Sequence, residues 1–188
     1  MKRRALAVGP RALVRRPERA DQAAFLAAAR ASRALHRGLV EPPLTAAQFR
    51  RFLARAEQST RECHLVCRRD DGSLCGVVNL NGITRGVAQS ATLGYYGFAP
   101  TAGQGLVAEG VELVLGRGFG RLRLHRVEAG VQPGNAASIA LLRRLGFREE
   151  GFSPRYIKIA GRWRDHVRFA IDADDWRRRR GAQRRSRL

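Results

Sequence analysis

The chain has 188 residues, 44% of them hydrophobic, which is enough to bury the core of one domain. It holds no run approaching the roughly 20 consecutive apolar residues of a transmembrane helix. Its basic first residues, Met1 to Arg4, are not followed by the apolar region that a signal peptide requires. We therefore expect a cytoplasmic protein that makes no contact with a membrane.

The charge is strongly positive, with 36 Lys and Arg against 16 Asp and Glu and a net charge of +20. Such a charge favours polyanionic partners, because each basic side chain near a phosphate adds attraction and releases counterions. Nucleic acid, a ribosome and a phosphorylated cofactor all fit. Arginine-biased codon usage would give the same composition, since Lys2 and Lys158 are the only lysines. Contact with rRNA through the basic surface and tail stays open.

The three cysteines, Cys63, Cys67 and Cys75, are odd in number and form no C-x-x-C pair. Neither a zinc site nor a disulfide framework is indicated. We predict reduced, buried thiols and no bound metal.

The first expected elements are a short strand and two helices. Residues 12–16 can form the strand, and alanines at helical spacing predict a helix over Glu18–His36. A second helix begins at Thr45, because Gln48 stands three residues later, as in a capping box, and an apolar stripe follows.

Strands and helices alternate in the rest of the chain, and Asp70 to Ser73 predicts a hairpin turn. Antiparallel strands first and a β-α-β unit in the middle predict an α+β fold, with a mixed, mostly antiparallel sheet and helices on both faces. The domain covers residues 1–176, and the arginine-rich residues 177–188 are predicted to be a disordered basic tail. The expected strands are residues 63–68, 74–80, 91–98, 126–131, 152–159 and 163–171, and the expected helices are residues 103–115 and 135–144.

A glycine-rich turn lies between a strand and a helix. Small residues there let successive backbone N–H groups and the helix N-terminus face a phosphate, although such a turn is as often only a tight turn. Ala108 stands where a dinucleotide motif needs its third glycine, and the P-loop pattern is missing. The turn comprises Gly103, Gln104, Gly105, Leu106, Val107 and Ala108.

A second motif, P-x-N-x-x-S-x-x-L-x-x-x-L-G-F, covers Pro133–Phe147, with Asn135 suited to begin a helix and Gly146 to end it. Alone it is a capped amphipathic helix. Together with the glycine-rich turn it resembles the paired motifs of GNAT acetyltransferases. Residues 93–96, 145–152 and 161–166 resemble the branch that acetylates ribosomal-protein alanines.

The resemblance implies a GNAT-like fold in which two central parallel strands splay apart to hold acetyl-CoA. The backbone amides of Gly103 through Ala108 would bind the pyrophosphate, and Asn135 would contact the pantetheine arm. A backbone N–H at Gly97 or Phe98 would stabilise the thioester oxygen, which makes Phe98 a further cofactor contact. Pro100 and Thr101-Ala102 depart from the family, whose side chains there are often basic. Phosphate binding would then rely more on backbone amides.

The catalytic residues also depart from the family. Leu142 stands where many members have the tyrosine that protonates the thiolate, so Ser138 is the substitute, unless it only caps or packs in its helix. Gly130 replaces the glutamate of related N-terminal acetylases. Glu128 is the alternative base, unless it is merely solvated, and residues 165–166 are a second option.

We therefore expect an acetyl-CoA-dependent N-acetyltransferase acting on the N-terminal amine of a ribosomal protein, with alanine as the acceptor residue. The partner would be that N-terminus or the ribosome. Two alternatives stay open: a GNAT enzyme acting on a small-molecule amine, and a ribosome- or RNA-binding protein without catalysis.

Overall fold

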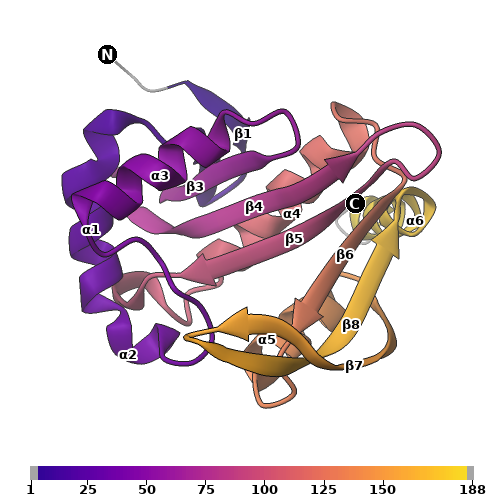
Figure 1. Cartoon of the computed structure of the whole chain (residues 1–188). Coiled ribbons are helices and arrows are strands. Elements are labelled where there is room, and N and C mark those ends of the chain that lie inside the picture. The colour runs from indigo at the N-terminus through magenta and orange to yellow at the C-terminus, as the bar shows by residue number, and fades with distance from the viewer. Residues whose placement is uncertain (1–3, 186–188) are drawn as a thin grey trace.

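The computed structural model describes residues 4–185, and the side chains of residues 4–182. This part of the chain forms one eight-stranded sheet in the order β1-β2-β3-β4-β5-β6-β8-β7 (Figure 1). All neighbouring strands are antiparallel except β5 and β6. The strands are β1 (Ala5–Val8), β2 (Ala12–Arg15), β3 (Glu62–Arg68), β4 (Leu74–Thr84), β5 (Ser90–Gly97), β6 (Arg126–Val131), β7 (Arg148–Ile159) and β8 (Arg162–Asp172).

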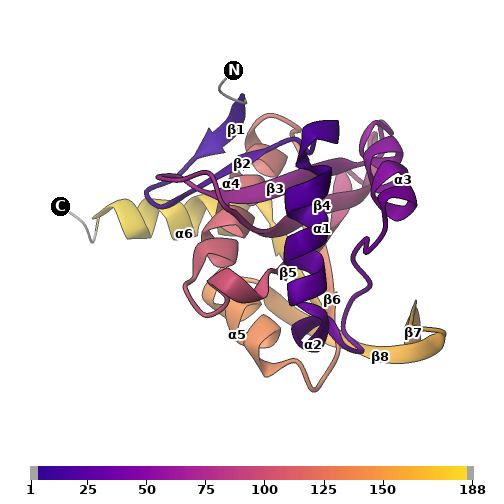
Figure 2. The ribbon, with the colours of Figure 1, turned by 90° about the vertical axis from the view of Figure 1, so that its left-hand side faces the viewer.

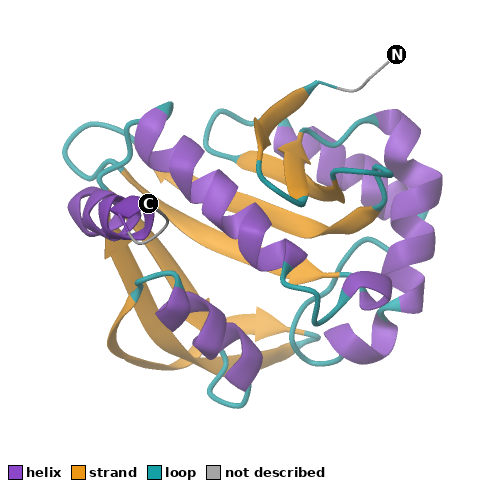
Figure 3. Cartoon of the chain, turned by 180° about the vertical axis from the view of Figure 1, so that it is seen from behind, coloured by secondary structure: helices purple, strands orange, loops and turns teal. Residues whose placement is uncertain are grey.

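Helices cover both faces of the sheet, as predicted (Figures 2 and 3). The segments α1, α2 and α3 lie on one face, and α4, α5 and α6 lie on the other. The α-helices are α1 (Gln22–Ala31), α2 (Arg33–His36), α3 (Ala46–Ala56), α4 (Leu106–Gly120), α5 (Ala136–Arg144) and α6 (Ala173–Arg185), and the 3-10 turns are η1 (Arg19–Asp21) and η2 (Ala99–Thr101).

The two parallel strands separate soon after they meet. β5 pairs with β6 only over Ser90–Thr92 and Arg126–Glu128. Beyond these residues the strands diverge, which Figure 1 shows. One edge of β5 therefore stays unpaired toward its C-terminal end, which confirms the predicted splay.

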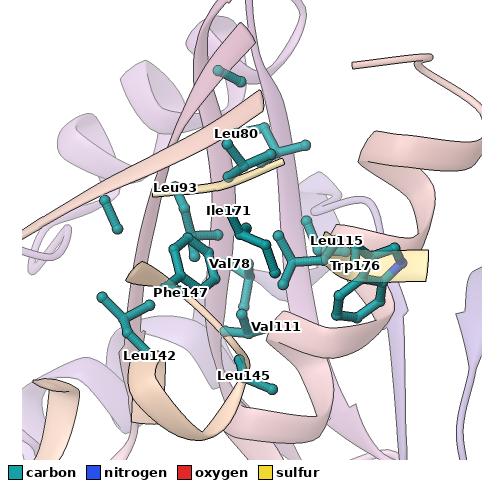
Figure 4. Packing of buried hydrophobic residues seen from close by; sticks show 14 of the residues in the cluster. Val78, Leu80, Leu93, Val111, Leu115, Leu142, Leu145, Phe147, Ile171 and Trp176 are labelled. Carbon is teal, nitrogen blue, oxygen red and sulfur yellow. The ribbon is translucent and has the colours of Figure 1, made fainter. Parts of the chain in front are cut away.

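A hydrophobic core lies on each face of the sheet. Side chains of α4, α5 and the strands beneath them form the larger cluster, part of which Figure 4 shows. Phe25, Phe49 and Phe98 anchor the smaller cluster under α1 and α3. Helix α4 lies very close to β3, because a Cβ on Gly110 would be 2.5 Å from a methyl of Val66. Glycine thus allows the helix to approach the sheet here.

The predicted helix over residues 18–36 is interrupted at Ser32, which separates α1 from α2. The Ser32 hydroxyl donates to the Ala28 carbonyl at 2.6 Å and accepts the Ala99 N–H at 2.8 Å. A side chain that bonds to the backbone in this way competes with helix continuation. Strand β1, which pairs with β2, was not predicted from the sequence.

The prediction of a disordered tail over residues 177–188 is wrong for residues 177–185, which continue α6. The helix is held to the domain because Trp176 packs against Phe119, with ring centroids 5.9 Å apart, and Arg179 bonds to Glu112 at 3.1 Å. The domain therefore extends past residue 176. Residues 186–188 lie outside the described part.

The three cysteines are free and buried, as predicted. Burial raises the pKa of each thiol. Within residues 4–185, none of the helices has the length and apolar character needed to span a membrane.

Candidate active site

The glycine-rich turn presents backbone amides at the N-terminus of α4. Gly103 and Gly105 both have φ of +76°, in the left-handed region that favours glycine. The N–H of Glu109 bonds to the Gly105 carbonyl at 3.1 Å, so the amides of the three residues before Glu109 have no partner within the helix. Their dipoles favour an anion at this end of the helix. Leu106 and Ala108 bury their side chains, so only their backbone is suited to binding.

Arginines from distant parts of the chain surround this turn. Arg68 Nη2 donates to Gln104 Oε1 at 2.6 Å, and Arg11 Nη1 donates to the Gln104 carbonyl at 3.2 Å. With Arg69 they line a cavity of about 450 Å³ beside Leu106. These side chains supply the positive charge that is missing just before Gly103. No local sequence motif predicts these arginines, because they lie far from the glycine-rich turn in the sequence.

Asn135 begins α5, as predicted. Its Oδ1 accepts the Ser138 N–H at 3.1 Å, which caps the helix. The Asn135 amide nitrogen is not used by this cap and suits a hydrogen bond to a pantetheine carbonyl.

Ser138 is paired with Tyr95 across the split. The two hydroxyl oxygens are 2.5 Å apart, and Tyr95 comes from β5 while Ser138 comes from α5. Burial raises the pKa of Tyr95 to about 12, and the hydrogen bond to Ser138 only partly opposes this. The phenol therefore keeps its proton at neutral pH. Leu142 is fully buried and takes no part.

At the end of β5 the structure distinguishes Gly97 from Phe98. The Phe98 side chain is fully buried, and its N–H donates to the Cys75 carbonyl at 2.8 Å. Neither the Phe98 side chain nor the Phe98 N–H is therefore available to a cofactor, contrary to the prediction. The Gly97 carbonyl instead accepts from His36 Nε2 at 2.7 Å, so the polar groups of Gly97 face away from β4.

Glu128 is held by arginines. Its two carboxylate oxygens accept from Arg126 and Arg168, each at 2.9 Å. The alternatives are also engaged: Asp165 accepts the Arg155 N–H at 2.7 Å, and His166 Nδ1 is 2.9 Å from the Arg164 carbonyl. The hydrogen bonds of these three residues go to groups other than the Tyr95–Ser138 pair.

The turn and the open edge of β5 fit a phosphorylated cofactor with a long neutral arm, because they combine free amides, arginines and an unpaired strand edge. Within the residues whose side chains are described, no group of three or more His, Cys, Asp or Glu is arranged to hold a metal ion.

Comparison with protein families matches residues 11–148 to the acetyltransferase (GNAT) domain. The probable N-acetyltransferase YjcK of Bacillus subtilis is 43% identical over 101 residues, or 54% of this chain and 56% of that protein. The ribosomal protein uS5-alanine N-acetyltransferase of Escherichia coli is 36% identical over 107 residues, or 57% of this chain and 55% of that protein. The matched region thus spans little more than half of each curated relative.

Among solved structures, Mycobacterium smegmatis RimJ in complex with CoA-disulfide superimposes with a TM-score of 0.80 at 28% identity. The superposition covers 89% of this chain and 88% of that one. It supports the predicted fold over nearly the whole described chain.

Proposed function

The chain belongs to the GNAT acetyltransferase family, whose acetyl donor is acetyl-CoA, and we propose that it acetylates the N-terminal alanine of a ribosomal protein. The observation that carries the reaction is the Tyr95–Ser138 pair across the splayed strands β5 and β6. The acceptor rests on the similarity to the uS5-alanine enzyme.

Cofactor binding is assigned to the turn and to the start of α5. The amides of Gly105 through Ala108 would receive the pyrophosphate, with Arg11 and Arg68 adding charge. Asn135 would donate its amide to the pantetheine arm. The pantetheine arm would lie along the unpaired edge of β5 in place of a neighbouring strand, with its amides hydrogen-bonded to the backbone of β5.

In the reaction, the neutral amine forms a bond to the acetyl carbon, the carbon–sulfur bond breaks, and the amine nitrogen gives one proton to solvent water. The Gly97 N–H is the oxyanion donor we propose, because it faces away from β4 while the Phe98 N–H is bonded to Cys75. Ser138 would give its proton to the departing sulfur and recover one from Tyr95, and the Tyr95 phenolate would take a proton back from solvent water.

The contacts of Glu128 do not favour it as the base. Both oxygens are occupied by Arg126 and Arg168, and Arg168 in turn lies 4.5 Å from the Tyr156 ring centroid. We assign Glu128 the role of holding Arg126 and Arg168 in place beside β7 and β8. An N-terminal amine has a reference pKa near 8, so part of it is neutral without help.

A small-molecule amine is the second acceptor class, and the net charge of +20 counts against cationic ones such as polyamines. A ribosome- or RNA-binding role without catalysis would use the basic surface but leaves the Tyr95–Ser138 pair unexplained.

The test combines mass spectrometry of ribosomal proteins, from cells with and without the gene, with a free-thiol assay on peptides beginning with alanine. Cells carrying the Tyr95→Phe/Ser138→Ala variant are the matched control. We expect one N-terminal acetyl group to disappear without the protein and to return only partly with the variant. If the ribosomal proteins are unchanged and thiol is released in the presence of small amines, the acceptor is a small-molecule amine.

A further inference from the structure

A second cavity, of about 440 Å³, lies on the opposite face of the sheet from α4. Its walls come from α1, α2, α3, the segment between α2 and α3, and Ala160 at the turn of the β7–β8 hairpin. Figure 1 shows that this turn reaches the segment after α2.

Two hydrogen bonds join the segment after α2 to the end of β6 and to the β7–β8 turn. Gln132 Nε2, just after β6, donates to the Gly38 carbonyl at 2.7 Å, and Glu41 Oε2 accepts the Ala160 N–H at 2.8 Å. His36 lines the cavity and also contacts Gly97 at the end of β5. The cavity therefore adjoins the place where β5 and β6 have separated.

Four arginines line the cavity: Arg33, Arg37, Arg51 and Arg55. None of their side chains has a hydrogen bond or ion pair with any described residue, whereas Arg126 and Arg148 elsewhere on the surface pair with carboxylates. Glu41 is the one acidic residue among the lining, and its carboxylate is bonded to Ala160. The cavity thus concentrates positive charge that the described chain does not neutralise.

His36 supplies a polar group at the inner end. Its side chain is 5% exposed. A carbonyl oxygen can only accept, so Nε2 must carry the proton that bonds to Gly97, and in the neutral ring Nδ1 then has the lone pair. Nδ1 is buried and has no partner among the described residues. A buried acceptor without a donor costs free energy, which a ligand N–H would recover.

We propose that this cavity selects an acceptor segment rich in Asp and Glu, with the amine at His36 Nδ1 and the carboxylates on the four arginines. The inference rests on the proposed acetyl transfer and names its substrate class. An ammonium group alone would be repelled by these arginines, so the acceptor must bring negative charge of its own. A lysine-rich or polyamine acceptor has the opposite charge.

Three peptides that begin with alanine test the selection: Ala-Glu-Glu-Glu-Gly-Trp, Ala-Gln-Gln-Gln-Gly-Trp and Ala-Lys-Lys-Lys-Gly-Trp. From two or three exposed arginine–carboxylate pairs we expect kcat/KM for the acidic peptide to be about five- to tenfold above the neutral one. The lysine peptide should be the poorest. The difference should shrink in about 0.5 M salt, where exposed charges are screened.

Arg51→Gln and Arg50→Gln form a matched pair, because Arg50 is the exposed neighbour on α3 that does not line the cavity. The preference for the acidic peptide should fall about two- to fivefold in Arg51→Gln, and further in Arg51→Gln/Arg55→Gln. Arg50→Gln should leave it unchanged. Turnover of the neutral peptide by Arg50→Gln should match that of the wild type.

Binding of the N-acetylated product peptides, followed by fluorescence anisotropy, separates the selection from catalysis. Acidic preference in binding without turnover of any peptide would contradict the proposed acetyl transfer but support the anionic site. Equal binding and turnover of the acidic and neutral peptides would overturn the inference and leave acetyl transfer standing. An RNA oligonucleotide that loses affinity in Arg51→Gln, with no peptide preference, would likewise overturn it.

Discussion

The hydroxyl of Tyr95 lies 2.5 Å from the hydroxyl of Ser138, and this contact joins β5 to α5 across the gap that opens between the parallel strands. A serine hydroxyl is a weak acid, but here it is hydrogen-bonded to a phenol that can replace the proton it gives up. Burial raises the pKa of that phenol to about 12, so it remains protonated throughout the neutral range. The pair can therefore pass a proton toward the sulfur without either group being ionised beforehand.

Removing either hydroxyl should slow the reaction while leaving cofactor binding intact. We expect Tyr95→Phe and Ser138→Ala each to lower kcat by about 10- to 100-fold, at or below the lower limit of the usual range for a lost proton donor, because a thiolate is a fair leaving group. The double variant should be little worse than the single ones, since the two act as a unit.

Steady-state kinetics and calorimetric titration with acetyl-CoA check this expectation. Thermal unfolding provides the control, because a variant that lost kcat through misfolding would also melt earlier. An unchanged kcat in both single variants would contradict the relay.

Cofactor affinity should depend on arginines that lie far from the turn in sequence. Arg68→Gln removes the 2.6 Å bond to Gln104 and one positive charge from the cavity beside Leu106. We expect the Kd of acetyl-CoA to rise about three- to tenfold, more at low salt than at high salt. Arg121→Gln, at the opposite end of α4, is the control with the same change of charge. Equal effects of the two variants would assign the loss to net charge alone.

Local features of the fold were predictable, since each depends on neighbours in sequence. The Thr45 capping box forms with Gln48 as expected, and Asn135 caps α5 through Ser138. Arg68 and Ser73 close the predicted hairpin, with the Arg68 N–H bonded to the Ser73 carbonyl at 2.9 Å.

Contacts between distant segments were not predictable. Tyr95 and Ser138 are 43 positions apart, and Arg11 reaches Gln104 over 93 positions. Composition indicated disorder for the arginine-rich end, but composition carries no information on Trp176 packing against Phe119, which fixes α6. His36 was not predicted as a site residue, because its role depends on a contact with the distant strand β5. Once Nε2 bonds to the Gly97 carbonyl, Nδ1 is left as a buried acceptor without a partner among the described residues.

Stability in acid should depend on Glu62. Burial opposes the ionised form of this carboxylate, but hydrogen bonding to His64 and the nearby charge of Arg117 outweigh it and lower its pKa from 4.5 to about 2. A carboxylate with a lowered native pKa stabilises the fold above its unfolded pKa, and this contribution is lost as the pH falls toward the native value.

Glu62→Gln should therefore cost about 2 to 3 kcal/mol of unfolding free energy at pH 7, and the difference from wild type should narrow between about pH 4.5 and pH 2. Urea unfolding across this range measures it. Glu57→Gln, at the exposed end of α3, should show no such dependence on pH. A loss at Glu62 that is constant with pH would indicate a packing effect instead.

His36 gives the sharpest test of how the acceptor amine is held. In His36→Gln the side-chain amide can still donate to the Gly97 carbonyl, but it has no imidazole nitrogen to accept a hydrogen bond from the amine. We expect kcat/KM for an acidic alanine peptide to fall about five- to tenfold, the scale of one lost hydrogen bond, while the Kd of acetyl-CoA stays within about twofold. His36→Ala should behave similarly and regain part of its kcat when free imidazole is added. A role limited to positioning Gly97 would give the reverse pattern, with His36→Gln nearly as active as wild type and no response of His36→Ala to imidazole.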